Sequence, residues 1–400
     1  MSTTDVDEIS GHVSENMKKL TAVLERIRQF DFAKHANALR PGFNPVVHMP
    51  ADASSLQRGG INVHVPITFC DGVRWLARIR QESTPGAKLI TESEGETMRV
   101  LKASGLQVPD AFLPRDPDAN FFFVELLEGY ACAAPIASGT LTNQQQHDLI
   151  RSIASFYVNL STITFSQIGS VVREPATNVL KVGCLISPDF CQNVAPFFFG
   201  PFKSSAHRYL AHIEHVLHEI EQHRAFSDGP FDTYVAHLWL RDLIQQSPRL
   251  REKETIHLKH ADDKGDQIMV DKDGNFVGII DWEWAYTASK SEAFAAPLAL
   301  VDVEAFFDGV NDLSPGEEKL AKAYEELGRP DLAACVRTGK VYQRLPMIVG
   351  QAPDVIQLHA FQHALTGQKG EEGSIEEWVA AKINGIYGAD VAALKMSIQN

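Results

Sequence analysis

The segment 260–284, HADDKGDQIMVDKDGNFVGIIDWEW, is compatible with few folds. It holds seven acidic residues, yet its runs QIMV and FVGII are apolar enough to be buried strands. An Asp-Gly pair lies between the two runs and is a strong two-residue turn signal, which predicts a β-hairpin. Counting outward from this turn sets Asp266 opposite Asp281 and Gln267 opposite Ile280. The polar ends of both strands are therefore expected to meet at one end of the hairpin.

A loop that precedes the hairpin adds further polar groups at this end. The run IHLK is read as a strand that delivers His260, Asp262 and Lys264 there. Carboxylates that are forced together repel, so such a cluster persists around a cation or around strong hydrogen-bond donors. Oxygen ligands of this kind suit a hard metal ion, and magnesium is the best match. Three further acidic residues are interpreted as solvated turn residues: Asp271, Asp273 and Glu283.

The composition sets the broad class of protein. A chain of 400 residues can bury a large core and favours two or three lobes. No stretch reaches the ~20 apolar residues of a membrane helix, and the N-terminus shows no secretory signal, so a cytoplasmic protein without a membrane partner is expected. The five cysteines lack metal-type spacing and predict reduced, mostly buried thiols. The net charge of -14 argues against nucleic acid as the partner and suits a cationic small molecule.

Changes of pattern along the chain predict three parts. Residues 1–50 carry a helical pattern and are read as an N-terminal helical extension. Residues 51–128 are dominated by strand patterns, with a hairpin turn predicted at Asp71-Gly72 and one helix ending near a Gly. Residues 129–400 are mostly helical, with an irregular Pro- and Phe-rich insertion and the hairpin 256–284. In this part a Thr142-x-x-Gln145 capping box predicts the start of one helix, and apolar residues at helical spacing predict two more around 205–222 and 231–246. The expected class is α+β, with a small β-rich lobe and a larger helical lobe.

The loop HADDKGDQ resembles the catalytic loop of the protein-kinase-like superfamily, His-x-Asp-x-x-x-x-Asn. Asp281 follows Asp262 by 19 positions, where that superfamily has its second metal-binding Asp. The sequence is most similar to the aminoglycoside phosphotransferase-like family, especially its fungal members, in which KHGDDKGD followed by a hairpin and GIIDWE is typical. The resemblance covers about residues 50 to 345 and implies a bilobal kinase-like fold. It also implies an ATP- and Mg-dependent small-molecule kinase that moves the γ-phosphoryl to a hydroxyl.

The resemblance assigns roles in the catalytic loop. It implies that Asp262 orients the acceptor hydroxyl and takes its proton, and that Lys264 reaches the transferred phosphate. His260 is expected to brace the loop through hydrogen bonds. Asp281 is expected to hold magnesium between the phosphates.

Two positions depart from the family pattern. Gln267 stands where the family has its metal-binding Asn, and Ala261 stands where a Gly usually follows the loop His. A Gln carbonyl can still bind magnesium, and the neighbouring Asp266 is the alternative ligand. These departures leave open a second function class, a catalytically silent kinase-like binding protein. Protein kinase activity ranks third, because nothing resembles an activation segment.

The nucleotide is expected between the lobes. The resemblance makes Arg78 in WLARIR the residue that anchors the phosphates, with Glu94 as its helix partner. Thr91-x-x-Glu94 is also a capping box, so a local helix-start role is the alternative for Glu94. The remaining expected nucleotide contacts are the turn over the phosphates, Gly59 and Gly60, and the hinge, where the Glu125 carbonyl and the Leu127 amide meet adenine.

Overall fold

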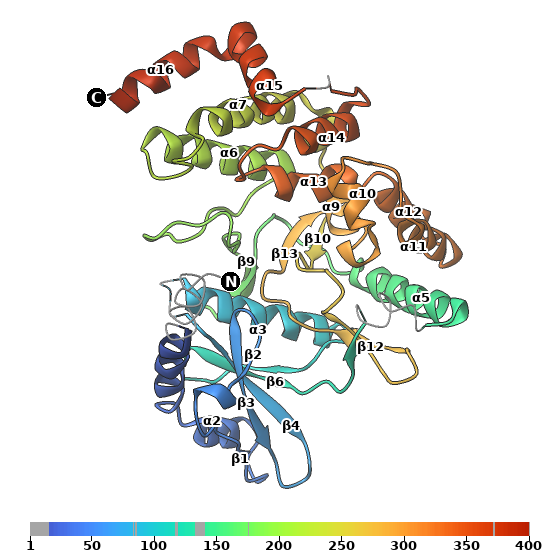
Figure 1. Ribbon diagram of the computed structural model, residues 1–400. Coiled ribbons are helices and arrows are strands. Elements are labelled where there is room, and N and C mark those ends of the chain that lie inside the picture. The colour runs from blue at the N-terminus through green and yellow to red at the C-terminus, as the bar shows by residue number, and fades with distance from the viewer. Residues whose placement is uncertain are drawn as a thin grey trace, which may run out of the picture.

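The chain folds into two lobes, a small lobe with a sheet and a larger, mostly helical lobe (Figure 1). The α+β two-lobe prediction is therefore confirmed. The computed structural model describes residues 16–82, 84, 86–116, 119–132, 141–174, 176–370 and 373–399.

The small lobe is built on an antiparallel sheet in the order β1-β3-β4-β6-β5, with β2 paired to β3. The alternation of β3 buries Val63, Val65 and Ile67 on one face. Gly72 forms the predicted turn to β4 with a φ of +87°. The strands are β1 (Val46–Val47), β2 (Gln57–Arg58), β3 (Asn62–Thr68), β4 (Arg74–Arg80), β5 (Ala111–Phe112) and β6 (Phe121–Glu125).

Helices cover both faces of this sheet. Phe121 and Phe123 of β6 pack with a helix over residues 16–27 and with α2, whereas Phe122 packs in the core that contains α3. The N-terminal helices thus share one hydrophobic core with the sheet. The other helices of this lobe are α2 (Phe32–Leu39), the 3-10 turn η1 (Ala53–Ser55) and α3 (Ala87–Ala103).

The large lobe begins with β7 (Tyr130–Ala131) and α5 (Asn143–Leu160), which starts with the predicted capping box of Thr142 and Gln145. The two following helices match their predicted ranges closely. The further elements are β8 (Val171–Arg173), β9 (Leu180–Val182), α6 (Ser205–Glu221), α7 (Pro230–Gln246), α8 (Pro248–Arg251), α9 (Lys290–Ala293), η2 (Leu298–Leu300), α10 (Val303–Phe307), α11 (Pro315–Glu326), α12 (Pro330–Arg337), α13 (Lys340–Ile348), α14 (Val355–Thr366), α15 (Ile375–Lys382), the π-helix η3 (Ile383–Tyr387) and α16 (Gly388–Gln399).

Two small sheets carry the segment 256–289. β10 (Ile256–Lys259) pairs with β13 (Tyr286–Ser289), and β11 (Ile268–Val270) lies between β7 and β12 (Phe276–Ile279). The predicted hairpin register is confirmed at the open end, where the Ile280 N–H donates to the Gln267 carbonyl at 2.9 Å beyond the last strand pair. Nearer the turn the register differs from the prediction, because a bulge between Met269 and Val270 sets Val270 opposite Phe276.

Two compositional expectations have mixed outcomes. All five cysteines are free, but only Cys132 and Cys335 are buried, while Cys70 and Cys191 are exposed, so the expectation of mostly buried thiols is wrong. Within the described ranges, the helices are too short or too polar to cross a membrane.

Candidate active site

The catalytic loop is held in place by His260, which is buried at the end of β10. Its Nε2 lies 2.9 Å from the Ile280 carbonyl, and the Asp262 N–H donates to its Nδ1 at 3.3 Å. These two partners make Nε2 the donor and Nδ1 the acceptor, because a carbonyl only accepts and an amide N–H only donates. The ring also packs edge-on against Trp282 at 4.6 Å. His260 therefore joins the loop to the end of β12 by hydrogen bonds.

Two residues of this region adopt left-handed backbone conformations. Ala261 has a φ of +70° and Asp281 a φ of +65°. A side chain in this conformation costs roughly 1 kcal/mol relative to Gly. This cost explains why the family usually has Gly at the position of Ala261. The backbone strain at Ala261 and Asp281 therefore lowers the stability of the folded chain slightly.

Asp262 and Lys264 lie together beyond His260. The Lys264 Nζ is 3.1 Å from Asp262 Oδ1, and the hydrogen bond to Asp262 raises the pKa of Lys264. The Asp262 side chain is 27% exposed and that of Lys264 62% exposed. Both groups are thus open to a small molecule, and they carry opposite charges.

Arg78 connects the two lobes. Its Nε donates to Glu94 of α3 at 3.0 Å, and its Nη2 donates to Asp281 Oδ1. Its Nη1 also lies 3.4 Å from His64 Nε2. Burial, together with the charge of Arg78, lowers the pKa of His64 to about 4, so this imidazole is neutral at pH 7. The structure therefore brings the predicted Arg78, Glu94 and Asp281 into one network.

Glu94 has no role at the start of its helix. α3 begins at Ala87, so Thr91 and Glu94 lie inside it, and the Thr91 hydroxyl donates to the Ala87 carbonyl at 3.0 Å. The capping-box alternative is therefore wrong, because the helix starts earlier than the motif suggests. Burial raises the pKa of Glu94 to about 7, and Arg78 opposes this shift.

Glu283 is the residue of the site that sequence reasoning misassigned. Its side chain is 4% exposed, so the interpretation as a solvated turn residue is wrong. Its Oε2 accepts from Asn62 Nδ2 at 3.0 Å, and its Oε1 pairs with Arg80 Nη1. Asn62 and Arg80 belong to the small lobe, so Glu283 is a second connection between the lobes. Asp271 and Asp273 do form the turn, where Asp271 accepts from the Asp273 and Asn275 amides.

The donor set at the open end of the hairpin fits a magnesium ion that nucleotide phosphates also bind. Gln267 is 4% exposed, and its Oε1 has no hydrogen-bond donor among the described residues. Asp281, whose side chain is 37% exposed, lies across the hairpin end. Asp266 is exposed. The described residues contain no cluster of three or more His, Cys, Asp or Glu, and magnesium in kinases needs only one or two protein ligands besides phosphates.

The predicted nucleotide contacts lie on the small lobe and at its junction with the large one. Gly59 and Gly60 form the turn from β2 to β3, and a Cβ added at either would meet no atom within 4 Å. Glu125 ends β6, and its carboxylate accepts from Lys102 Nζ at 3.3 Å and from the Asp110 amide at 3.1 Å. Its side chain is thus engaged within the lobe. Leu127 follows and lies against Gly278 of β12.

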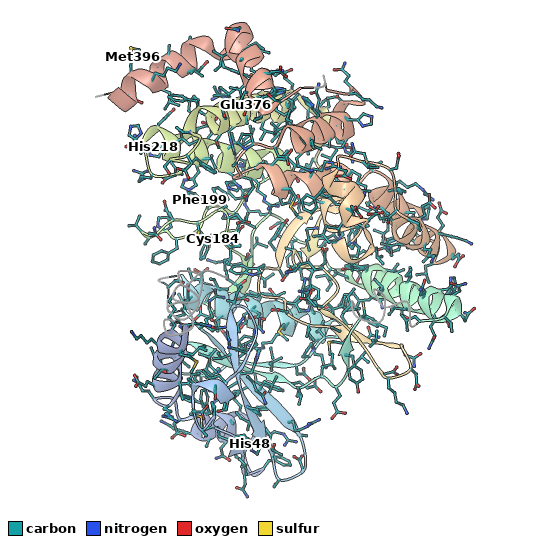
Figure 2. All side chains as sticks on the ribbon, in the orientation of Figure 1. His48, Cys184, Phe199, His218, Glu376 and Met396 are labelled. Atoms are coloured by element: carbon teal, nitrogen blue, oxygen red, sulfur yellow. The ribbon has the colours of Figure 1, made fainter. Side chains whose placement is uncertain are left out.

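A cavity of about 340 Å³ opens beside the catalytic loop. Asp262 and Lys264 line one end of it, and α6 lines another side. The Pro- and Phe-rich segment between β9 and α6 supplies a wall, and Figure 2 shows Cys184 and Phe199 of this segment between the sheet and α6. Sequence reasoning could not find this cavity, because its walls come from six separate parts of the chain.

Comparison with known proteins finds similar solved structures and one matching family model. The chain is similar to the solved structure of the streptomycin-ATP-APH(2")-IIa ternary complex, at 14% identity over 85% of this chain and 97% of that chain, with a TM-score of 0.49. It is also similar to ADP-bound aminoglycoside phosphotransferase APH(2'')-Ib, at 13% identity over 85% of this chain and 98% of that chain, with a TM-score of 0.48. A third similar structure is macrolide 2'-phosphotransferase MphH from Brachybacterium faecium, at 15% identity over 85% of this chain and 99% of that chain, with a TM-score of 0.41. Comparison with curated proteins gave no match. The model of the phosphotransferase enzyme family matches residues 57–288, which include both lobes' contributions to the site. The chain therefore belongs to the phosphotransferase enzyme family.

Proposed function

We propose that the protein is an ATP- and Mg-dependent small-molecule kinase that transfers the γ-phosphoryl of ATP to a hydroxyl. The observation that carries the proposal is the Arg78 network. One guanidinium contacts both Glu94 of the small lobe and Asp281 of the large lobe, beside the loop that His260 holds. Glu94 fixes this guanidinium at the junction of the lobes, and a guanidinium is a planar donor set that would suit a phosphate group if magnesium were to occupy the Asp281 carboxylate.

Asp262 is the proposed base. The acceptor oxygen forms a bond to the γ-phosphorus, and the bond from that phosphorus to the β–γ bridging oxygen breaks, with the electron pair leaving on ADP. The hydroxyl proton goes to the Asp262 carboxylate. Lys264, 3.1 Å from Asp262, is proposed to donate to the transferred group and to offset its charge.

The nucleotide is proposed to lie under the Gly59-Gly60 turn. The open space around both glycines leaves room for phosphates close to their backbone amides. At the other end of the nucleotide, the Glu125 carbonyl and the Leu127 amide are proposed to bind adenine.

Asp281 and Gln267 are proposed to hold the magnesium ion. The unpartnered buried Oε1 of Gln267 favours it over the exposed Asp266. When bound, magnesium supplies positive charge at the phosphate oxygens. Asp281 supplies the carboxylate, which Arg78 holds at the hairpin end.

The test is a screen of the purified protein with ATP and magnesium against alcohols and amino-alcohols, with phosphorylated product followed by mass. Product that depends on both ATP and magnesium is the expected result. Nucleotide binding, measured as a melting shift, without product from any acceptor and without ATP hydrolysis would favour the silent kinase-like binding protein instead.

A further inference from the structure

The cavity beside the catalytic loop has a defined charge pattern. Three basic side chains line it: Arg208, Lys259 and Lys264. Two acidic side chains line it: Asp189, which is exposed, and Asp262. Which of these five charged groups already has an ion-pair partner determines the charge that is left to bind an acceptor.

Two of the three basic groups are already neutralised. Arg208 Nη1 donates to Glu292 Oε1 at 2.6 Å, and these side chains are only 10% and 0% exposed. The hydroxyls of Tyr209 and Tyr286 also donate to this carboxylate, at 3.0 and 2.8 Å. Lys264 pairs with Asp262 at 3.1 Å. Neither cation is therefore free to attract an anionic ligand strongly.

Lys259 differs from both. Its Nζ has one long hydrogen bond, 3.4 Å to the Glu292 carbonyl, and it pairs with no carboxylate within 4.0 Å in the described part of the chain. Its position is fixed, because it ends β10 and precedes the buried His260. An ammonium group on a cavity wall with so little compensation favours a ligand anion. His212, also in the wall, adds no charge, since burial lowers its pKa to about 3.

Several of the other lining side chains are apolar or aromatic, and the cavity is small. Phe190, Trp284 and Val349 line it. A volume of about 340 Å³ is near the lower end of the range for small-molecule pockets. A polycationic acceptor would need several free carboxylates, whereas Asp189 is the only one besides Asp262 among the lining residues.

We propose, on the basis of the proposed kinase function, that the acceptor is a small hydroxylated carboxylate with an apolar body. Its carboxylate binds Lys259, its apolar part lies against Phe190 and Trp284, and its hydroxyl reaches Asp262. Lys259 and Asp262 are three positions apart on one braced segment, so they define the separation of the two ligand groups. The whole-chain charge of -14 suits a cationic acceptor, but the residues around the cavity select the opposite charge.

Three probes of one shape and different charge test this inference. They are 4-(hydroxymethyl)benzoate, its methyl ester, and 4-(aminomethyl)benzyl alcohol, which carry charges of about -1, 0 and +1 at neutral pH. Binding to the full chain with a non-hydrolysable ATP analogue and magnesium is measured by calorimetry. The benzoate is expected to bind about tenfold or more tightly than the other two, as for one charge-assisted hydrogen bond. Equal binding of the three, tightest binding of the amine, or no binding of the benzoate at about 10 mM would overturn the proposal.

Variants of Lys259 separate ligand recognition from a structural role, because its Nζ also donates to the Glu292 carbonyl near the end of α9. Lys259→Met is expected to abolish the preference for the benzoate while leaving the ester unchanged, and Lys259→Arg is expected to restore it. Lys290→Met is the matched control, since Lys290 lies on α9 but bonds Asp331 at 2.7 Å. A preference that survives Lys259→Met would contradict the assignment. Because calorimetry needs no turnover, benzoate binding without product would refute the kinase function alone, and phosphorylation of the amine in preference would refute this inference alone.

Discussion

Glu283 allows a sharp test of how the two lobes are held together. The substitution Glu283→Gln keeps the shape of the side chain and an oxygen for Asn62, but it removes the charge that faces Arg80. Arg80 is 11% exposed and Glu283 4% exposed, so the pair lies largely outside water. Breaking one half of a buried ion pair costs about 3 to 5 kcal/mol, because the other charge stays buried. Since the Asn62 hydrogen bond can persist, we expect about 3 kcal/mol.

The chain offers a matched control on the same sheet. Glu128 pairs with Arg74, but these side chains are 78% and 46% exposed. Glu128→Gln is therefore expected to cost less than about 1 kcal/mol. Both pairs join an arginine of β4 to a glutamate, but Glu283 is buried and also lies 3.5 Å from Arg78, whereas Glu128 is exposed.

The assay is urea unfolding followed by circular dichroism and by tryptophan fluorescence, with the free energy of unfolding taken from each midpoint and slope. The expected result is a loss of about 3 kcal/mol for Glu283→Gln, with a separation of the two transitions if the lobes uncouple. Equal losses for the two variants, or a loss below about 1 kcal/mol for Glu283→Gln, would refute the reasoning that burial makes this pair important.

Asp262→Asn is expected to abolish phosphoryl transfer while ATP affinity stays within a few-fold, because the carboxylate acts on the acceptor; weakened ATP binding with normal turnover of the bound complex would argue against this role. Asp281→Ala should remove the magnesium dependence of nucleotide binding, and a titration with unaltered magnesium affinity would place the metal elsewhere. Gln267→Asn should keep or raise kcat, whereas Gln267→Leu should cost about 2 to 4 kcal/mol in transition-state stabilisation. Asp266→Ala should have a kcat near that of the wild type. A large loss of kcat in Asp266→Ala alone would instead assign the metal to Asp266. His64 has a folded pKa of about 4, below its unfolded value of 6.5, so the unfolded chain binds more protons between these values and stability falls as pH drops from 6.5 to 4. His64→Asn should remove up to about 3 kcal/mol of this fall in urea unfolding at a series of pH values, and an unchanged pH profile would contradict the shift.

The features that sequence reasoning predicted correctly depend on short-range rules. The hairpin follows from one turn signal between two apolar runs, and the start of α5 follows from a four-residue capping motif. The contact between Arg78 and Asp281 spans 203 positions, and only the family resemblance suggested that both belong to one site.

Glu283 shows why other features could not be predicted. It follows a strand and sits among acidic residues, which is typical of solvated turns. Its burial depends on Asn62, which is 221 positions away, and on Arg80 of the same small lobe. No local pattern encodes such a pairing, because the side chains meet only after both lobes have formed. The same holds for the cavity near Lys259, whose walls assemble from distant segments.

The packing of the N-terminal helices against the sheet sets a limit for shortened versions of the protein. The family match begins at residue 57, but Leu20, Leu24, Ile27 and Phe32 are at most 5% exposed and share the core of the sheet. Burying each such side chain stabilises a fold by about 1.5 to 3 kcal/mol. The four together therefore contribute as much as the whole free energy of unfolding of a typical domain. A recombinant chain cut at the family boundary would expose this face of the sheet and is expected to aggregate, whereas one that starts ahead of residue 16 keeps the face covered.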